Sequence, residues 1–313
     1  MKQRVVFLHR KGMARAGSKI MRCDQLRDIC EAHLGDEFDF RVRPMPPIRE
    51  ETDIQKVCGT VRGAIVILLK GAAVPLGDQG MEALRKSARG ICIDYVDADA
   101  YRSFSPWADV HIGASHAGCR LLSNVLKKAG QNESDAPIMH LTHHADPRLD
   151  GLHIRHQQEL RGVYMGHPSN VFIPPDIQGD VHVLKYENDL GIGGVFDNLL
   201  DFNLHYAVRA PALRPRITKE AKPFTKGFIA AAVGANILVP RATDDAVIYL
   251  GEDYPFLLEN TEPNTIVEGL HQARDLFGTS AWSEATQRME HIREITRPGR
   301  IANEMKDILA LFR

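Results

Sequence analysis

Short apolar runs alternate with longer amphipathic stretches over residues 4–142. The run Ala64–Leu69 is unbroken and rich in β-branched residues, as expected of a strand that is buried on both faces of a parallel sheet. Alternation of such runs with helical stretches predicts parallel strands joined by crossover helices. The predicted strands are 4–9, 38–42, 64–69, 90–95, 110–113 and 138–142, and the predicted helices are 18–34, 79–88 and 118–128.

A second alternation of the same kind follows the polar segment His143–Gly151, whose turn-forming and charged residues favour a domain boundary. The predicted strands of this half are 161–165, 181–184, 203–209 and 236–239, and residues 263–313 are predicted to be almost wholly helical. We therefore expect an α/β protein with two Rossmann-like domains, one over 1–150 and one over 151–298.

The last helix is predicted to be separate from the one before it. Pro298 and Gly299 interrupt the helical pattern, so the chain can change direction at this point. An apolar stripe that must pack on another element then follows, formed by Ile301, Met305, Ile308 and Phe312.

Length and charge narrow the classes of protein to consider. A chain of 313 residues suits two domains of ordinary size. The net charge is −1, so no overall field attracts nucleic acid or an anionic membrane, and we expect no nucleic-acid partner. No apolar segment has the length of a membrane span or a signal peptide, and the five cysteines form no CxxC pair. These features predict a cytoplasmic protein with reduced thiols; a homo-oligomer is compatible with all of them.

Three cations gather in the second half, around one strand end and one predicted helix start. Arg209 ends a predicted strand, and Lys222 and Lys226 bound the run Lys-Pro-Phe-Thr-Lys, which contains Thr225. We place Pro223 in a first helical turn, so that both lysines lie on one face at the helix N-terminus. The helix dipole favours anions there, so a bound phosphate would resolve the conflict of two lysines at this end. The alternative is that both lysines extend into water.

Two other stretches of the second half suit a ligand. Asp244 and Asp245 are predicted in the first turn of a short helix that starts near residue 243, where carboxylates either cap the helix or bind a sugar or ribose hydroxyl. The loop with Gly166, Ser169 and Asn170 follows a strand and suits close approach of the backbone to a diphosphate. An ordinary turn is an equally good interpretation of this loop.

In the first half, the loop His9–Ser18 between the first strand and its helix is cationic and contains glycine. Ligands bind at such strand ends in open α/β sheets, so Arg10 and Gly17 are candidate contacts, with a solvated loop as the alternative. The loop lacks the GxGxxG spacing and a following acidic residue, which makes a nicotinamide cofactor unexpected.

A carboxylate and a histidine complete the candidates. Asp97 follows the predicted strand 90–95 and is a candidate acceptor contact or general base, although loop capping explains it equally well. His144 lies in the expected hinge and is a candidate acceptor contact. The 14 histidines form no HxH or HExxH pattern, so we expect no metal site.

Several of these features together resemble the C-terminal half of GT-B glycosyltransferases. They are Arg209, the run Lys222–Lys226, a small-residue helix closed by Gly234, and a strand followed by Tyr249-Leu-Gly-Glu-Asp-Tyr-Pro255. Twin α/β halves, a hinge after Thr142 and a terminal helix extend the resemblance over nearly the whole chain.

The resemblance implies a nucleotide-sugar donor in the second domain. It implies that Arg209 and Lys226 hold the donor diphosphate, with Lys222 as a third contact, and that helix 299–313 crosses back to the first domain, which binds the acceptor. The sequence departs from the pattern of retaining members, because Ala230 or Ala231 stands where the first of two glutamates eight positions apart would fall. Retention and inversion of the sugar configuration therefore both stay open.

The expected activity is metal-independent transfer of a sugar from a nucleotide-diphosphate sugar to a saccharide or small-molecule acceptor. The nucleotide sugar is a substrate, and no cofactor is expected. An epimerase of nucleotide sugars has the same architecture and is one alternative. A binding protein that has lost its chemistry is the other, and the missing glutamate favours it.

Overall fold

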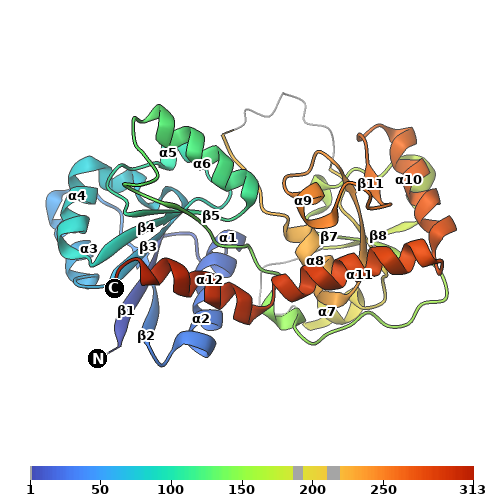
Figure 1. The fold of residues 1–313 in the computed structure, drawn as a ribbon, viewed down its shortest axis with the longest axis horizontal. Helices are drawn as coiled ribbons and strands as arrows, with labels where there is room; N and C mark the ends of the chain where they lie inside the picture. The colour runs from blue at the N-terminus through green and yellow to red at the C-terminus, as the bar shows by residue number, and fades with distance from the viewer. Residues whose placement is uncertain (1, 186–192, 210–218) are drawn as a thin grey trace. The chain divides into compact units, whose positions relative to one another are not determined.

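The computed structural model describes residues 2–185, 193–209 and 219–313. These residues pack into two units (Figure 1). Unit 1 contains residues 2–143 together with 219–223 and 298–313, and unit 2 contains the described residues of 144–297 apart from 219–223. The chain thus enters the second unit at His144, and a short segment of the second half, 219–223, packs with the first.

Unit 1 is built on a six-stranded sheet in which every pairing is parallel. The strand order is β2-β1-β3-β4-β5-β6, so the order reverses between β1 and β3. Ligands of open α/β sheets bind outside the carboxyl ends of the strands at such a reversal. The strands are β1 (Gln3–Arg10), β2 (Phe38–Met45), β3 (Ile65–Leu69), β4 (Gly90–Asp94), β5 (Val110–Gly113) and β6 (Ile138–His140).

The first predicted helix of unit 1 is one continuous helical stretch with a change of pitch inside it. It consists of α1 (Gly17–Lys19), a π-helical turn (Ile20–Gln25) and α2 (Leu26–Leu34). One face of this stretch, with Cys23, Leu26, Cys30 and Leu34, lies in the core. The remaining helices of this part of the chain are α3 (Glu51–Thr60), α4 (Gly77–Ser87), α5 (Ala100–Ser103) and α6 (His116–Lys128).

The terminal helix α12 (Pro298–Ala310) packs in unit 1 beside α2, as Figure 1 shows in red. Its predicted stripe is buried there, with Ile301, Met305 and Ile308 inaccessible to solvent in the same core as Leu26. The prediction that the last helix returns to the first half of the chain is confirmed. A side chain at Gly90 would collide with the ring of Phe312, so glycine lets the end of α12 lie close to β4.

Unit 2 contains a five-stranded parallel sheet with the order β11-β10-β9-β7-β8. This order reverses between β7 and β9, so each unit has one reversal of the same kind. The strands are β7 (Gly162–Met165), β8 (Val181–Leu184), β9 (Leu204–Tyr206), β10 (Asn236–Pro240) and β11 (Leu257–Leu258). The helices are α7 (Gly193–Leu199), α8 (Thr225–Val233), α9 (Ala246–Leu250), α10 (Pro263–Leu276) and α11 (Ser280–Ile295). Short 3₁₀ turns occur in both units at 70–72, 74–76, 147–149, 168–170 and 175–177.

The predicted start of α8 is wrong. The helix begins at Thr225, and Lys222 and Pro223 precede it in chain without regular secondary structure. Phe224 has non-helical backbone angles because its buried ring packs against Phe228 and Tyr249, which turns the chain just before the helix.

The predicted start of α9 is also wrong. This helix begins at Ala246, so Asp244 and Asp245 lie before it rather than in its first turn. Asp245 is buried and has a left-handed backbone with φ of 62°, which non-glycine residues adopt rarely. Among the described residues, no helix is both long and apolar enough to cross a bilayer.

Candidate functional site

The first candidate site lies at the strand-order reversal of unit 2. β7 ends at Met165 and is followed by Gly166, and β9 is followed by the short segment that leads to Arg209. Lys226 lies in the first turn of α8. Ligands of open α/β sheets bind at the carboxyl ends of strands where the order reverses, so these residues occupy the expected place for a ligand.

Lys226 is held in one position across the end of β7. Its Nζ donates a hydrogen bond to the carbonyl oxygen of Met165 at 2.7 Å. The same atom lies over the ring of Tyr164, 4.0 Å from the ring centroid, which is a cation–π contact. These two contacts hold the ammonium group at the end of β7.

Basic groups crowd around Lys226. Burial, and then the positive charge of Arg209, lower the pKa of Lys226 to about 7. His205 on β9 is buried, and burial followed by the charge of Lys226 lowers its pKa to about 3. The interaction of Lys226 with Arg209 is a repulsion between cations, and burial beside Lys226 keeps His205 neutral, so an anion at this place would stabilise the charged form of Lys226. The structure thus brings together Arg209 and Lys226, which the sequence had paired.

His205 itself was not predicted. The ring Nε2 of His205 is buried and has no hydrogen-bond partner among the described residues. A buried histidine inside an apolar strand is usually part of the core, and the sequence gives no sign that a lysine of a distant helix lies beside it.

The loop after β7 requires glycine at position 166. Gly166 has φ of 153°, and a Cβ atom there would lie 2.9 Å from the hydroxyl of Tyr164. The chain then forms the 3₁₀ turn Pro168–Asn170, in which the amide of Ser169 donates to Nδ1 of His167 at 3.3 Å. Ser169 and Asn170 are exposed, and Thr225 at the start of α8 is half-buried.

Asp245 and Lys222, two other predicted residues of the second half, do not lie as the sequence predicted. Asp245 makes no side-chain hydrogen bond that caps α9, so the capping interpretation fails for this residue. Lys222 packs with unit 1, whereas Lys226 belongs to unit 2. The two lysines do not share a helix face, because only Lys226 is helical.

The residues predicted in the first half lie at the carboxyl edge of the unit 1 sheet. Arg10 is the exposed last residue of β1, and Gly17 is the first residue of α1. Asp97 follows β4 and forms an ion pair with Lys70, which follows β3. His144, predicted as an acceptor contact, is the first residue of unit 2, and its Nδ1 lies 2.6 Å from the carbonyl oxygen of Ala145.

A buried polar network in unit 1 was not predicted. Arg22 is inaccessible to solvent, and its Nε donates to Oδ2 of Asp94 at 2.7 Å. Its Nη1 donates to the carbonyl oxygens of Leu141 and Thr142. Thr142 in turn donates to the carboxylate of Glu304 from its amide at 2.7 Å and from its hydroxyl at 2.9 Å. Burial raises the pKa of Glu304, while the bonds from Thr142 and the charge of Arg22 oppose that rise.

This network fixes α12 and the end of β6 to the π-helical turn. The sequence pattern could not reveal it, because Arg22 stands among the apolar residues of its helix and Asp94 is 72 positions away.

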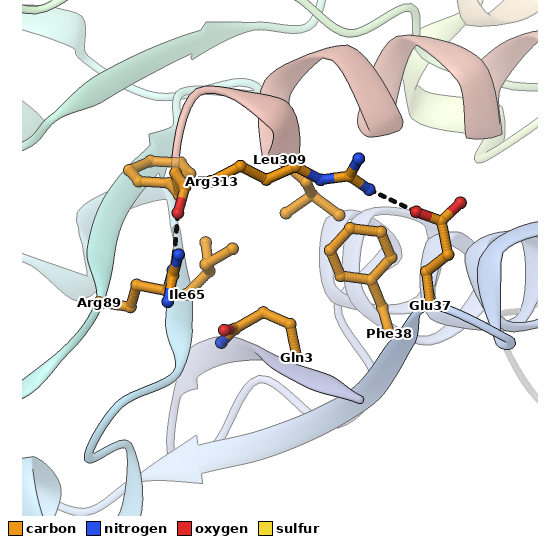
Figure 2. A pocket seen from close by; sticks show the side chains of 8 residues that line it. Gln3, Glu37, Phe38, Ile65, Arg89, Leu309 and Arg313 are labelled. Carbon is orange, nitrogen blue, oxygen red and sulfur yellow. Dashed lines mark hydrogen bonds and ion pairs between the residues drawn. The ribbon is translucent and has the colours of Figure 1, made fainter. Parts of the chain in front are cut away.

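A cavity of about 190 Å³ lies in unit 1 at the amino ends of the strands (Figure 2). It is lined by the first residues of three strands, Gln3, Phe38 and Ile65, and by the end of α12. Its charged groups are already engaged: Arg89 donates to the carbonyl oxygen of Phe312 at 2.6 Å, and Arg313 pairs with Glu37. These contacts attach α12 to the sheet, so we interpret the cavity as structural.

Within the described parts of the chain, no group of three or more His, Cys, Asp or Glu side chains is arranged to hold a metal ion.

No protein-family model and no curated protein matches this sequence. Solved structures do match its fold. A glycosyltransferase from Rickettsia africae ESF-5 has 10% sequence identity and a TM-score of 0.67, and the match covers 99% of this chain and 98% of that one. The apo form of the lipopolysaccharide outer core galactosyltransferase WaaB has 7% identity and a TM-score of 0.61, over 99% of both chains. A UDP-forming α,α-trehalose-phosphate synthase from Burkholderia vietnamiensis has 10% identity and a TM-score of 0.56, over the full length of both chains.

These likenesses show the fold. Two parallel sheets, each with its helices, match the two Rossmann-like domains of the GT-B architecture. The fold class predicted from the sequence is confirmed.

Proposed function

We propose that this chain is a glycosyltransferase that moves a sugar from a nucleotide-diphosphate sugar to a hydroxyl group of an acceptor. The carrying observation is the crowding of Lys226 and Arg209 at the strand-order reversal of unit 2, where burial and mutual repulsion lower the pKa of Lys226. Such an arrangement is unfavourable without a ligand and favourable with a diphosphate between the cations. The fold neighbours that are titled as glycosyltransferases support the same proposal.

The chemistry assigned to these residues is electrostatic. As the bond between the anomeric carbon and the diphosphate oxygen breaks, its electron pair stays on the diphosphate, and negative charge grows there. Lys226 and Arg209 stabilise that charge. Fixed cations are effective because they need no reorganisation during the reaction. They supply positive charge of the kind that a metal ion would supply, so transfer is expected to proceed in the presence of EDTA.

The remaining residues have supporting parts in the proposal. Gly166 allows the backbone to approach the diphosphate, and the exposed turn with Ser169 and Asn170, together with Thr225, offers further hydrogen bonds. Asp244 and Asp245 are assigned to hydroxyl groups of the sugar or ribose.

In unit 1, Arg10 and Gly17 are assigned to the acceptor side, as is His144 at the start of unit 2. Asp97 accepts the proton of the acceptor hydroxyl while the oxygen of that hydroxyl forms a bond to the anomeric carbon. A general base of this kind suits an inverting reaction.

The test is a thermal-shift panel of UDP-, GDP-, TDP- and CMP-sugars, because a ligand of the folded state raises the apparent melting temperature. We expect a diphosphate sugar to raise it and CMP-sugars, which carry a single phosphate, to raise it less. Turnover is then measured with the donor that binds. If the donor alone, without any acceptor, is converted to an isomerised sugar, the result would favour an epimerase. Donor binding without any turnover would favour an inactive binding protein.

The matched variants are Arg209→Met and Arg274→Met. Arg274 is also a cation of unit 2, but it pairs with Asp180, which lies at the amino end of β8 and not at the carboxyl ends of the strands. Loss of donor binding in the first variant alone supports the proposal. Equal donor binding by both variants and the unaltered protein would refute it.

A further inference from the structure

Two strained residues face each other across neighbouring strand ends of unit 1. Lys70 follows β3 with φ of 52°, and Asp97 follows β4 with φ of 47°. Among the residues that the structure describes, only Asp245 is a third non-glycine residue with positive φ. This conformation is disfavoured for residues with a side chain and accumulates at functional sites.

The strain at Lys70 is not forced by the sequence of the turn. The next residue is Gly71, which adopts a left-handed conformation at little cost, yet Gly71 has φ of −73°. The turn therefore places its unfavourable backbone on the lysine although a glycine is adjacent. A structural turn alone gives no reason for this choice.

The side chains of the two residues form an incomplete ion pair. Nζ of Lys70 lies 3.9 Å from Oδ2 of Asp97, which is too far for a hydrogen bond. The side chains are 22% and 40% exposed, so an ion pair between them contributes little to stability and does not offset two left-handed residues. A hydroxyl oxygen beside both groups would complete the pair, because it accepts a hydrogen bond from the ammonium and donates one to the carboxylate.

The pair also lies where a ligand is expected. The strand order of unit 1 reverses between β1 and β3, and Lys70 is the first residue after β3. β4 is the next strand, with Leu69 beside Asp94 in the register, which brings the two loops together at the same edge. Arg10 ends β1 on the other side of the reversal.

We propose that Lys70 and Asp97 together bind one hydroxyl group of a carbohydrate, and that Lys70 is thus a further acceptor-binding residue. That this carbohydrate is the acceptor of the transfer rests on the proposed function, whereas carbohydrate binding at this pair does not. Nζ of Lys70 and Oδ2 of Asp97 are 3.9 Å apart, so one oxygen atom that lies beside the line joining them can be within hydrogen-bond distance of both. A sugar hydroxyl suits this position, and a phosphate does not, because Asp97 repels it.

The test uses the whole protein without any nucleotide. Methyl α-glucoside, methyl α-galactoside and methyl α-mannoside are screened by saturation-transfer NMR, and the affinity of the best ligand is measured by calorimetry. We expect Lys70→Met and Asp97→Asn each to weaken it about tenfold, the usual effect of losing one charge-assisted hydrogen bond. Lys56→Met is the matched control, because Lys56 pairs with Asp53 at 3.5 Å on the exposed helix α3; its affinity should be unchanged.

A third variant tests the strain directly. Lys70→Gly should raise the melting temperature of the free protein, since glycine relieves the strain of the left-handed backbone. It should also lower the affinity for the glycoside as much as Lys70→Met does. Absence of binding by all three glycosides in the unaltered protein, or equal affinity in Lys70→Met, would overturn the inference.

The same experiment separates this inference from the proposed function. Lys226→Met should leave glycoside affinity unchanged. Glycoside binding that depends on Lys70, in a protein that binds no nucleotide sugar, would refute the transferase and keep the carbohydrate site. Donor turnover that is insensitive to Lys70→Met, with no glycoside bound, would do the reverse.

Discussion

Replacing Lys226 with methionine offers the sharpest test of the cation cluster, because it should change stability and donor binding in opposite directions. Methionine has a similar length and can pack against the ring of Tyr164 without placing a charge there. The donor diphosphate, in contrast, loses a fixed cation. We expect a fall in turnover of about 100-fold or more, the usual loss when one preorganised charge contact is removed.

The stability effect follows from the lowered pKa of Lys226, which is about 7 in the folded protein against 10.5 normally. Between these two pH values the unfolded chain binds a proton at Lys226 that the folded chain has lost. The free energy of unfolding of the unaltered protein therefore rises with pH in this window, by at most about 1.4 kcal/mol per pH unit. Below pH 7 the lysine is charged in both states, and its burial penalty is present in full.

Methionine has no such dependence. The stability difference between the unaltered protein and Lys226→Met should therefore shift by roughly 2 kcal/mol in favour of the lysine from pH 7 to pH 9. At pH 6 the variant should be the more stable of the two.

The assay must report on unit 2 alone, because two units need not unfold together. Trp282 lies on α11 of unit 2, and Trp107 lies in unit 1. With Trp107→Phe as the background, urea unfolding followed by Trp282 fluorescence at pH 6, 7, 8 and 9 gives the free energies. A stability difference that stays constant from pH 7 to pH 9 would show that Lys226 keeps its ordinary pKa, and the argument from crowded cations would fail.

Three other variants test separate parts of the structure. Arg209→Gln removes the charge that is the second cause of the lowered pKa of Lys226, so the pH window of the same titration should move upward; an unmoved window would place Arg209 too far away to matter. Arg22→Met leaves Asp94 buried without the positive charge of Arg22 and should lower the free energy of unfolding by about 3–5 kcal/mol. The thermal unfolding of unit 1, followed by Trp107 fluorescence in a Trp282→Phe background, measures this loss. A loss below about 1 kcal/mol would contradict the network. Gly90→Val places a side chain against the ring of Phe312 and should release the end of α12, seen as faster hydrogen exchange at residues 309–313. Gly59→Val on α3, with nothing near its Cβ position and no positive φ, should leave that exchange unchanged.

The sequence by itself determined the architecture. Strand and helix periodicities are local properties of the chain, so the two sets of parallel strands and the separate last helix could be predicted from residue spacing. Pro298 and Gly299 marked the break before α12, and the stripe through Ile301, Met305 and Ile308 indicated that it needed a partner. Arg209 and Lys226 could be paired because each adjoins the end of a strand or the start of a helix.

Only the tertiary structure decided where individual side chains meet. The start of α8 depends on Phe224, whose ring packs against Tyr249, 25 positions away, and this separates Lys222 from the helix. The pairing of Arg22 with Asp94 and of Lys70 with Asp97 depends on which strands become neighbours, and spacing along the chain carries no record of that. Left-handed backbones at Lys70 and Asp97 belong to residues without a local preference strong enough to demand them, so the packing around each turn imposes them.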